Sequence, residues 1–197
     1  GISGTKVKGN YIGVTSDGNT VGTSSASAIK NNGSSNTIIG YEEGTNSVCT
    51  AGLQRNIVGS ASATYAVSIQ GATSSDIHVS GNYIGIGADG STDIGGTGVG
   101  LAVDSSSAVL SDVYFGTDGD GTDDALEGNV ISGWSSNGVF VYRVTNVRVS
   151  GNIIGFAADG ITARGNGATG ITSRSSTSVV GWCDTTVNAT VCSDSGT

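Results

Sequence analysis

The chain has 197 residues, of which 34 are glycine and 12% are charged, and it contains no proline or methionine. Glycine-rich sequence without proline excludes collagen, and no apolar run approaches the roughly 18 residues of a transmembrane helix. The formal net charge of −8 argues against nucleic acid and anionic membranes as partners, because both bind basic patches. The apolar residues are mostly valine and isoleucine in short runs, which is typical of β-strands.

One motif recurs three times along the chain. A Gly-Asn-Tyr/Ile-Ile-Gly segment begins at residues 9, 81 and 151 and contains Asn10, Asn82 and Asn152. The offsets are 72 and 70 residues (82 − 10 and 152 − 82). An Asp-Gly pair follows each motif at the same distance, with its aspartates at Asp17, Asp89 and Asp159. A fixed internal period of this length indicates a repeat architecture, and we read the three aspartates as turn residues.

Weaker echoes of the motif subdivide each repeat. Strand-like segments open at residues 10, 36, 56, 82, 112, 129, 152 and 178. We therefore expect three coils in each repeat of about 70 residues, with roughly 23 residues per coil and about eight coils in the chain.

Short segments between these openings alternate large apolar residues with small or polar ones. They cover residues 65–69, 77–79, 99–103, 139–142 and 147–149. Such strands bury one face only if coil stacks on coil, about 4.8 Å apart. The recurring asparagine suits a coil corner and can hydrogen-bond along the stack as a ladder. The sequence therefore predicts an all-β parallel β-helix, a solenoid, as a single domain over residues 1–197. We expect it to be a fragment or processed piece of a larger surface protein.

The motifs resemble those of a known family. Gly-Asn-Tyr-Ile-Gly is followed by Asp-Gly, and Asn-Val-Ile-Ser-Gly at residues 129–133 is followed by Asn-Gly-Val at 137–139. This pattern is similar to the right-handed parallel β-helix repeats of large secreted bacterial and archaeal surface proteins in the pectin-lyase-like superfamily. The resemblance covers nearly the whole chain and implies right-handed winding and an extracellular or cell-surface location. It says little about function, because one fold serves many functions.

The superfamily includes polysaccharide lyases and glycoside hydrolases, so catalytic constellations need to be sought. Glycoside hydrolysis uses two carboxylates on opposite sides of one bond. The single histidine, His78, lies between Ile77 and Val79, and this alternation directs it outward. No Gly-His-Gly or Arg-Ile-Lys segment is present. We therefore expect a protein that is not an enzyme, with a carbohydrate-binding or carbohydrate-cleaving module as the alternative.

An acidic turn is the best ligand-site candidate in the sequence. Asp118, Asp120, Asp123 and Asp124 alternate with glycines, and oxygen ligands in this pattern suit calcium. A solvated acidic loop without a bound ion is the other interpretation. No other cofactor is indicated.

The cysteines and the ends of the stack bear on assembly. Cys183 and Cys192 bracket a short polar segment and are disulfide candidates, although three buried thiols would also fit. Cys49 is then left as a candidate for an intermolecular bond. The open ends of a stack expose unpaired backbone groups, so partners could be other copies, flanking repeats or surface glycans. We expect an extracellular structural scaffold, with two alternatives for its assembly: head-to-tail self-assembly into a filament, or a segment of a long adhesin-like chain with no assembly of its own. Asn32 and Asn188 match the glycosylation pattern.

Overall fold

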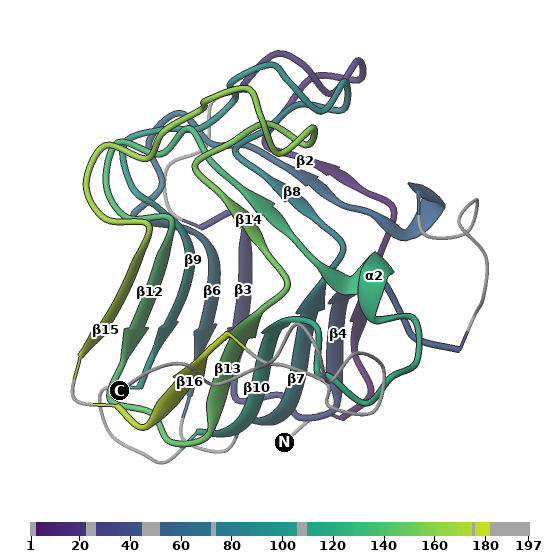
Figure 1. The fold of residues 1–197 in the computed structure, drawn as a ribbon, viewed down its shortest axis with the longest axis vertical. Helices are drawn as coiled ribbons and strands as arrows, with labels where there is room; N and C mark the ends of the chain where they lie inside the picture. Colours follow the sequence, from purple (N-terminus) through teal and green to yellow (C-terminus); the bar gives the residue numbers. More distant parts are fainter. Residues whose placement is uncertain are drawn as a thin grey trace.

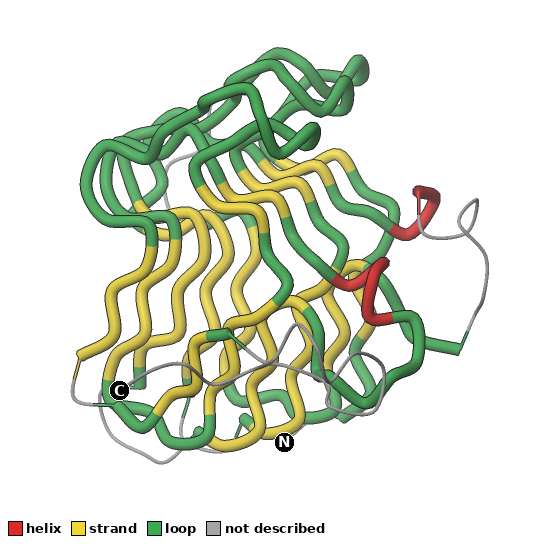
Figure 2. The backbone as a smooth tube through the Cα atoms, in the orientation of Figure 1, coloured by secondary structure: helices red, strands yellow, loops and turns green. Residues whose placement is uncertain are grey.

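The computed structural model describes residues 3–22, 27–44, 52–71, 74–105, 110–174 and 176–181. The chain winds as a solenoid whose walls are three parallel sheets, and each circuit adds one strand to each wall (Figure 1). Loops join the walls at the corners (Figure 2). The prediction of an all-β parallel β-helix is confirmed. None of the described helices is long and apolar enough to cross a membrane.

The strands are short and follow one another in a fixed rotation. The first sheet contains β1 (Lys6–Val7), β4 (Thr37–Gly40), β7 (Ser75–Ser80), β10 (Ser111–Gly116), β13 (Val147–Ser150) and β16 (Ser178–Val180). The second contains β2 (Tyr11–Ile12), β5 (Ile57–Val58), β8 (Tyr83–Ile84), β11 (Val130–Ile131) and β14 (Ile153–Ile154). The third contains β3 (Ile29–Asn32), β6 (Tyr65–Gln70), β9 (Val99–Asp104), β12 (Val139–Tyr142) and β15 (Ile171–Arg174). Among the residues that the structure describes, helical structure is limited to residues 52–54 and α2 (Asp124–Glu127).

The core is built from rows of inward-facing side chains, and each row takes its residues from matching positions on neighbouring strands. In the first sheet, the inward row runs through Val7, Ile39, Val79, Phe115 and Val149. The last four side chains of this row are at most 2% exposed. Burial of one such side chain stabilises the fold by roughly 1.5–3 kcal/mol. These side chains are buried only when neighbouring turns stack on one another, so contacts between turns hold the structure together.

A ladder of asparagine side chains runs along the corner that precedes the second sheet. Each asparagine donates its backbone N–H and its amide Nδ2–H to the Oδ1 of the asparagine on the next turn, at 2.9–3.2 Å. The rungs are Asn10, Asn56, Asn82, Asn129 and Asn152. The three central rungs are fully buried. The amides thus satisfy corner groups that the sheets leave unpaired.

The prediction of eight coils is wrong. The openings at residues 10, 56, 82, 129 and 152 are successive rungs of the ladder, and the chain completes four turns from the first to the last. The openings at 36, 112 and 178 instead lie at the starts of β4, β10 and β16 in the first sheet. They therefore mark a second corner of the solenoid and do not begin additional turns. Successive rungs are 46, 26, 47 and 23 residues apart, so each repeat of about 70 residues spans two turns rather than three. Right-handed winding stays a prediction.

Alternate turns carry a protruding hairpin between the second and third sheets. The hairpins occupy residues 14–21, 86–93 and 156–163, and an isolated antiparallel bridge closes each of them. They form a column at the top of Figure 1. The other turns instead carry long loops after the first sheet, at residues 41–56 and 117–129. The alternation of these two loop types explains why the repeat spans two turns.

Candidate functional site

One row of outward side chains crosses the middle of the first sheet. Strand register places Ile38, His78, Tyr114 and Arg148 side by side on β4, β7, β10 and β13. The His78 and Tyr114 rings are stacked with centroids 4.6 Å apart. The Arg148 guanidinium lies 5.7 Å from the centroid of the Tyr114 ring. The row therefore stacks two aromatic rings face to face beside a cation, and His78 has the outward position that the sequence predicts.

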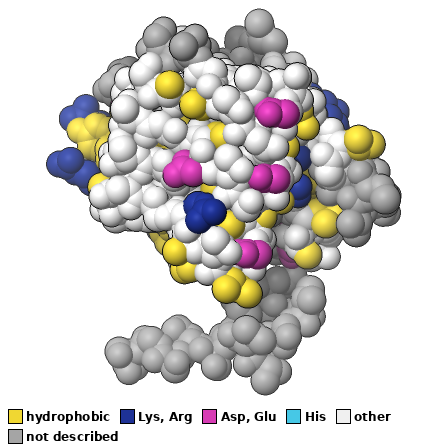
Figure 3. Space-filling view, turned by 90° about the horizontal axis from the view of Figure 1, so that it is seen from above, with side chains coloured by type: hydrophobic (Ala, Val, Ile, Leu, Met, Phe, Trp, Pro, Cys, Tyr) yellow, Lys and Arg dark blue, Asp and Glu magenta, His cyan; other side chains and the backbone are white. Residues whose placement is uncertain are grey.

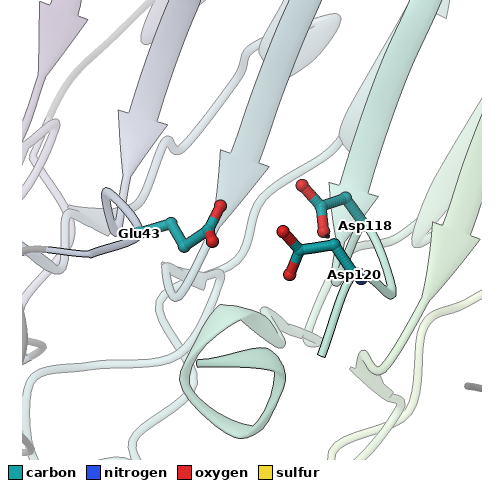
Figure 4. Close-up of side chains that lie close together, drawn as sticks. All are labelled: Glu43, Asp118 and Asp120. Carbon is teal, nitrogen blue, oxygen red and sulfur yellow. Dashed lines mark hydrogen bonds between the residues drawn. The ribbon is translucent and has the colours of Figure 1, made fainter. Parts of the chain in front are cut away.

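Two acidic loops border this row along one edge. They follow β4 and β10, so they lie two turns apart and face each other. Glu43 from one loop points towards Asp118 and Asp120 from the other (Figure 4). Carboxylate oxygens of these three residues lie within 4.8 Å of one another. Three like charges at this distance repel, which favours a bound cation or a shared proton.

A second group of carboxylates lies deeper in the same loop. Oxygens of Asp118, Asp124 and Glu127 also lie within 4.8 Å of one another, so Asp118 belongs to both groups. Glu127 is only 3% exposed and accepts a hydrogen bond from the backbone N–H of Asp118 at 3.2 Å. The Thr117 hydroxyl donates to Asp124. The loop thus combines a buried carboxyl group with exposed ones.

The environment separates the acidities of these groups. Burial, followed by the charge of Asp118, raises the pKa of Glu127 to about 8. Burial and the charges of Asp120 and Asp118 also raise the pKa of Glu43. Hydrogen bonds from Lys6 and Lys8, in contrast, lower the pKa of Glu42. These loops therefore combine a carboxyl group of raised pKa, Glu127, with one of lowered pKa, Glu42, a combination that suits binding of hydroxyl groups or a cation.

A cleft of about 230 Å³ opens between the row and the loops. It is lined by Ile38, Tyr41, Glu42, Glu43, His78, Ser80 and Glu127. His78 lies 3.2 Å from an Asp76 oxygen and 3.8 Å from an Asp118 oxygen. We call the outward row, the two acidic loops and this cleft the acidic groove. It is a small polar recess with one aromatic wall.

The structure divides the four aspartates that the sequence proposes as calcium ligands. Asp118 approaches Asp120 on one side and Asp124 on the other, whereas Asp123 accepts hydrogen bonds from the Tyr41 hydroxyl at 2.7 Å and the Gly44 N–H at 3.3 Å. Asp123 precedes α2 in a left-handed conformation (φ 57°), which separates it from the others.

Sequence reasoning missed Glu43 and Glu127 as members of the cluster. Glu43 lies on a different turn from Asp118, and the two-turn period is the signal that could have paired their loops. The residues that could hold a divalent cation are Glu43, Asp118 and Asp120, or Asp118, Asp124 and Glu127.

The recurrent aspartates lie in the hairpins, away from the acidic groove. Asp89 accepts backbone N–H bonds from Ser91 and Thr92 and a hydroxyl bond from Thr92. Asp159 repeats this pattern with Ile161 and Thr162, and Asp17 accepts from the N–H of Asn19. Seen from the hairpin side, acidic side chains are dispersed rather than gathered in one patch (Figure 3). These aspartates shape turns.

Of the glycosylation and disulfide candidates, only Asn32 lies among the described residues. Asn32 is exposed at the end of β3. Asn188 and the three cysteines, Cys49, Cys183 and Cys192, lie outside the described residues.

We compared the chain with known protein families, curated proteins and solved structures. No protein-family model, no curated protein and no solved structure matches this chain. The fold defines the chain as a parallel β-solenoid, and its function is a matter of proposal.

Proposed function

We propose that this chain is a structural scaffold of an extracellular or cell-surface protein, and that it is not an enzyme. The observation that carries the proposal is the asparagine ladder, whose five rungs are linked over four turns through side-chain amides. Within the described part of the chain, buried polar side chains such as Asn82, Ser80 and Ser150 bond to neighbouring strands and loops. Such an interior stiffens the stack and supports a role as a rigid spacer.

A direct test separates a scaffold from a catalyst. The purified chain is incubated with neutral and acidic polysaccharides, while new reducing ends and unsaturated products are followed over time. A scaffold gives no products and resists proteolysis across residues 74–105 and 110–174. Product release by the natural chain that is lost in Glu43→Gln would refute the proposal and identify an enzyme.

Carbohydrate binding is the second candidate, and the stacked His78–Tyr114 pair favours it. The Tyr114 hydroxyl, the His78 ring nitrogens, the neighbouring carboxyl groups and Arg148 can hydrogen-bond to the hydroxyl or carboxylate substituents of a sugar. His78, Glu42, Glu43 and Glu127 line the cleft, and Tyr114 and Arg148 continue the outward row beyond His78. A bound calcium ion at Glu43, Asp118 and Asp120 could bridge the protein to an acidic sugar.

The binding candidate has a matched control within the chain. Titration of the natural protein and of Tyr114→Ala with soluble oligosaccharides tests the groove, while Tyr11→Ala removes an exposed tyrosine from the second sheet. Loss of binding in Tyr114→Ala alone supports a groove ligand. Binding that is equal in all three proteins excludes the groove as the site.

A further inference from the structure

The two acidic loops meet across the turn that separates them. They follow β4 and β10, and β7 lies between these strands in the first sheet. The Tyr41 hydroxyl of the first loop donates to Asp123 Oδ2 of the second at 2.7 Å, and the Gly44 N–H donates to the same oxygen at 3.3 Å. Tyr41 is only 2% exposed. A buried side chain of one loop is therefore hydrogen-bonded to the other loop, two turns further along.

A glycine on the intermediate turn lets the loops come together. Gly81 follows β7 with a left-handed backbone (φ 67°), and its N–H donates to the Glu127 carbonyl of the second loop at 2.7 Å. A Cβ at this position would lie 2.8 Å from the Tyr41 Cβ and 3.0 Å from the Leu126 carbonyl oxygen. Any side chain here would therefore push the two loops apart.

Like charges act against this contact across the same gap. Glu43 points from the first loop towards Asp118 and Asp120 of the second, and carboxylate oxygens of the three lie within 4.8 Å of one another (Figure 4). Burial, followed by the charges of Asp120 and Asp118, raises the pKa of Glu43, as repulsion between neighbouring carboxylates requires. The hydrogen bond to Asp123 holds the loops together, and this repulsion drives them apart.

The second loop has a fixed base and a pliable tip. At the base, the Thr117 N–H donates to a carbonyl of β13 at 3.1 Å. At the tip, Gly119 and Gly121 have left-handed backbones (φ 73° and 91°), and residues 120–122 are exposed. Asp123 is also left-handed (φ 57°), a conformation that costs free energy in a residue other than glycine unless its surroundings hold it. Loss of the bond to Tyr41 therefore also releases strain.

We propose that the Tyr41–Asp123 hydrogen bond is a latch that holds the two acidic loops closed beside the cleft, and that its breaking lets the second loop swing away. Glu127 lines the cleft and is 3% exposed while the loops are closed. Opening therefore uncovers this carboxyl group and widens the cleft, whereas a cation between Glu43 and Asp118 would remove the repulsion and favour the closed loops. This inference goes beyond the scaffold proposal, because it concerns loops that lie outside the sheets.

Hydrogen exchange of the full chain at pH 7 tests the latch, with the amides of Gly44 and Gly81 as reporters. Both donate to acceptors on the second loop. Tyr41→Phe removes only the hydroxyl, so exchange at these amides should become faster by about tenfold or more. Tyr83→Phe is the matched control, because the Tyr83 hydroxyl makes no hydrogen bond within the part of the chain that the structure describes.

Glu43→Gln tests the opposing force and has the opposite expected sign. The glutamine keeps the length of the side chain and can still accept the hydrogen bond from Thr122, but it removes the charge. Exchange at the same two amides should therefore become slower, by about twofold or more. Added salt should slow exchange in the natural chain and have less effect in Glu43→Gln, because it screens the same repulsion.

The two variants decide the proposal together. Faster exchange in Tyr41→Phe and slower exchange in Glu43→Gln, with Tyr83→Phe unchanged, is the expected result. Unchanged exchange in Tyr41→Phe, or faster exchange in Glu43→Gln, overturns the latch. Circular dichroism checks folding, and Glu43→Gln alone decides if Tyr41→Phe does not fold. The polysaccharide assay still decides the scaffold proposal separately.

Discussion

The asparagine ladder gives the sharpest prediction about stability. Asn82 is fully buried, and its Nδ2 donates to the carbonyls of Ile39 and Ser80 and to Asn129 Oδ1, while its Oδ1 accepts from Asn56. In Asn82→Ala, the backbone N–H of Asn56 loses its acceptor and the Ile39 carbonyl loses this donor. At about 1–3 kcal/mol for each orphaned buried group, the free energy of unfolding should fall by roughly 2–6 kcal/mol.

The end of the same ladder provides the matched control. Asn10 is exposed, and its side chain donates to Lys8 O and Asn56 Oδ1. Water can replace these bonds, so Asn10→Ala should cost no more than about 1 kcal/mol. Urea unfolding followed by circular dichroism measures both variants. Equal losses, or a loss below about 1 kcal/mol for Asn82→Ala, would show that the ladder does not stabilise the stack.

Three further predictions concern the acidic groove and the hairpin column. Because the pKa of Glu127 is raised from 4.5 to about 8, the folded state retains a proton that the unfolded state releases, so stability should fall as pH rises between these values. Glu127→Gln should remove this pH dependence of stability and should be more stable than the natural chain at pH 8 by up to a few kcal/mol. Urea unfolding at several pH values measures both proteins, and identical pH profiles for the two would contradict the reasoning. Calcium at about 100 times its dissociation constant should stabilise the fold by about 2.7 kcal/mol, seen as a higher Tm, with the gain lost in Asp118→Asn and kept in Asp17→Asn. No shift in the natural chain would leave the acidic groove without a cation. Gly18→Ala should lower the free energy of unfolding by at least about 1 kcal/mol more than Gly160→Ala, as measured by urea unfolding. Both glycines have a left-handed backbone (φ 69° and 67°), but only Gly18 faces a neighbouring Cβ. Equal losses would mean that the neighbouring hairpin moves to make room for the added methyl group.

The recurrence of Asn10, Asn82 and Asn152, together with the alternating strand-like segments between them, predicts a stacked parallel solenoid. The number of turns could not be derived in the same way, because two kinds of corner look alike in sequence. Asn36 and Asp112 stand at the starts of first-sheet strands with a left-handed backbone, and short apolar segments follow them as they follow the ladder asparagines. Unequal loops between successive rungs conceal the single-turn period, so only the two-turn repeat is visible.

The acidic groove was predicted in part, for a related reason. Alternating aspartates identified the loop at residues 117–129, but a pattern within one loop cannot reveal a partner on another turn. Glu43 reaches Asp118 only because long loops recur on alternate turns. Its spacing predicts Asp123 as a ligand of the ion. In the structure, the left-handed backbone of Asp123 before α2 turns its carboxylate towards Tyr41 instead. Local backbone conformation thus decided which carboxylates converge.

The two-turn period connects these features. A solenoid that repeats every turn has the same loop on every level, and neighbouring loops are then separated by one strand spacing, about 4.8 Å. Placing hairpins and acidic loops on alternate turns doubles this spacing. It gives Glu43 and Asp118 room to face each other across a cleft, and it lets each hairpin rest on the next through a single backbone bond. Loop placement therefore sets both the geometry of the acidic groove and the spacing of the hairpin column.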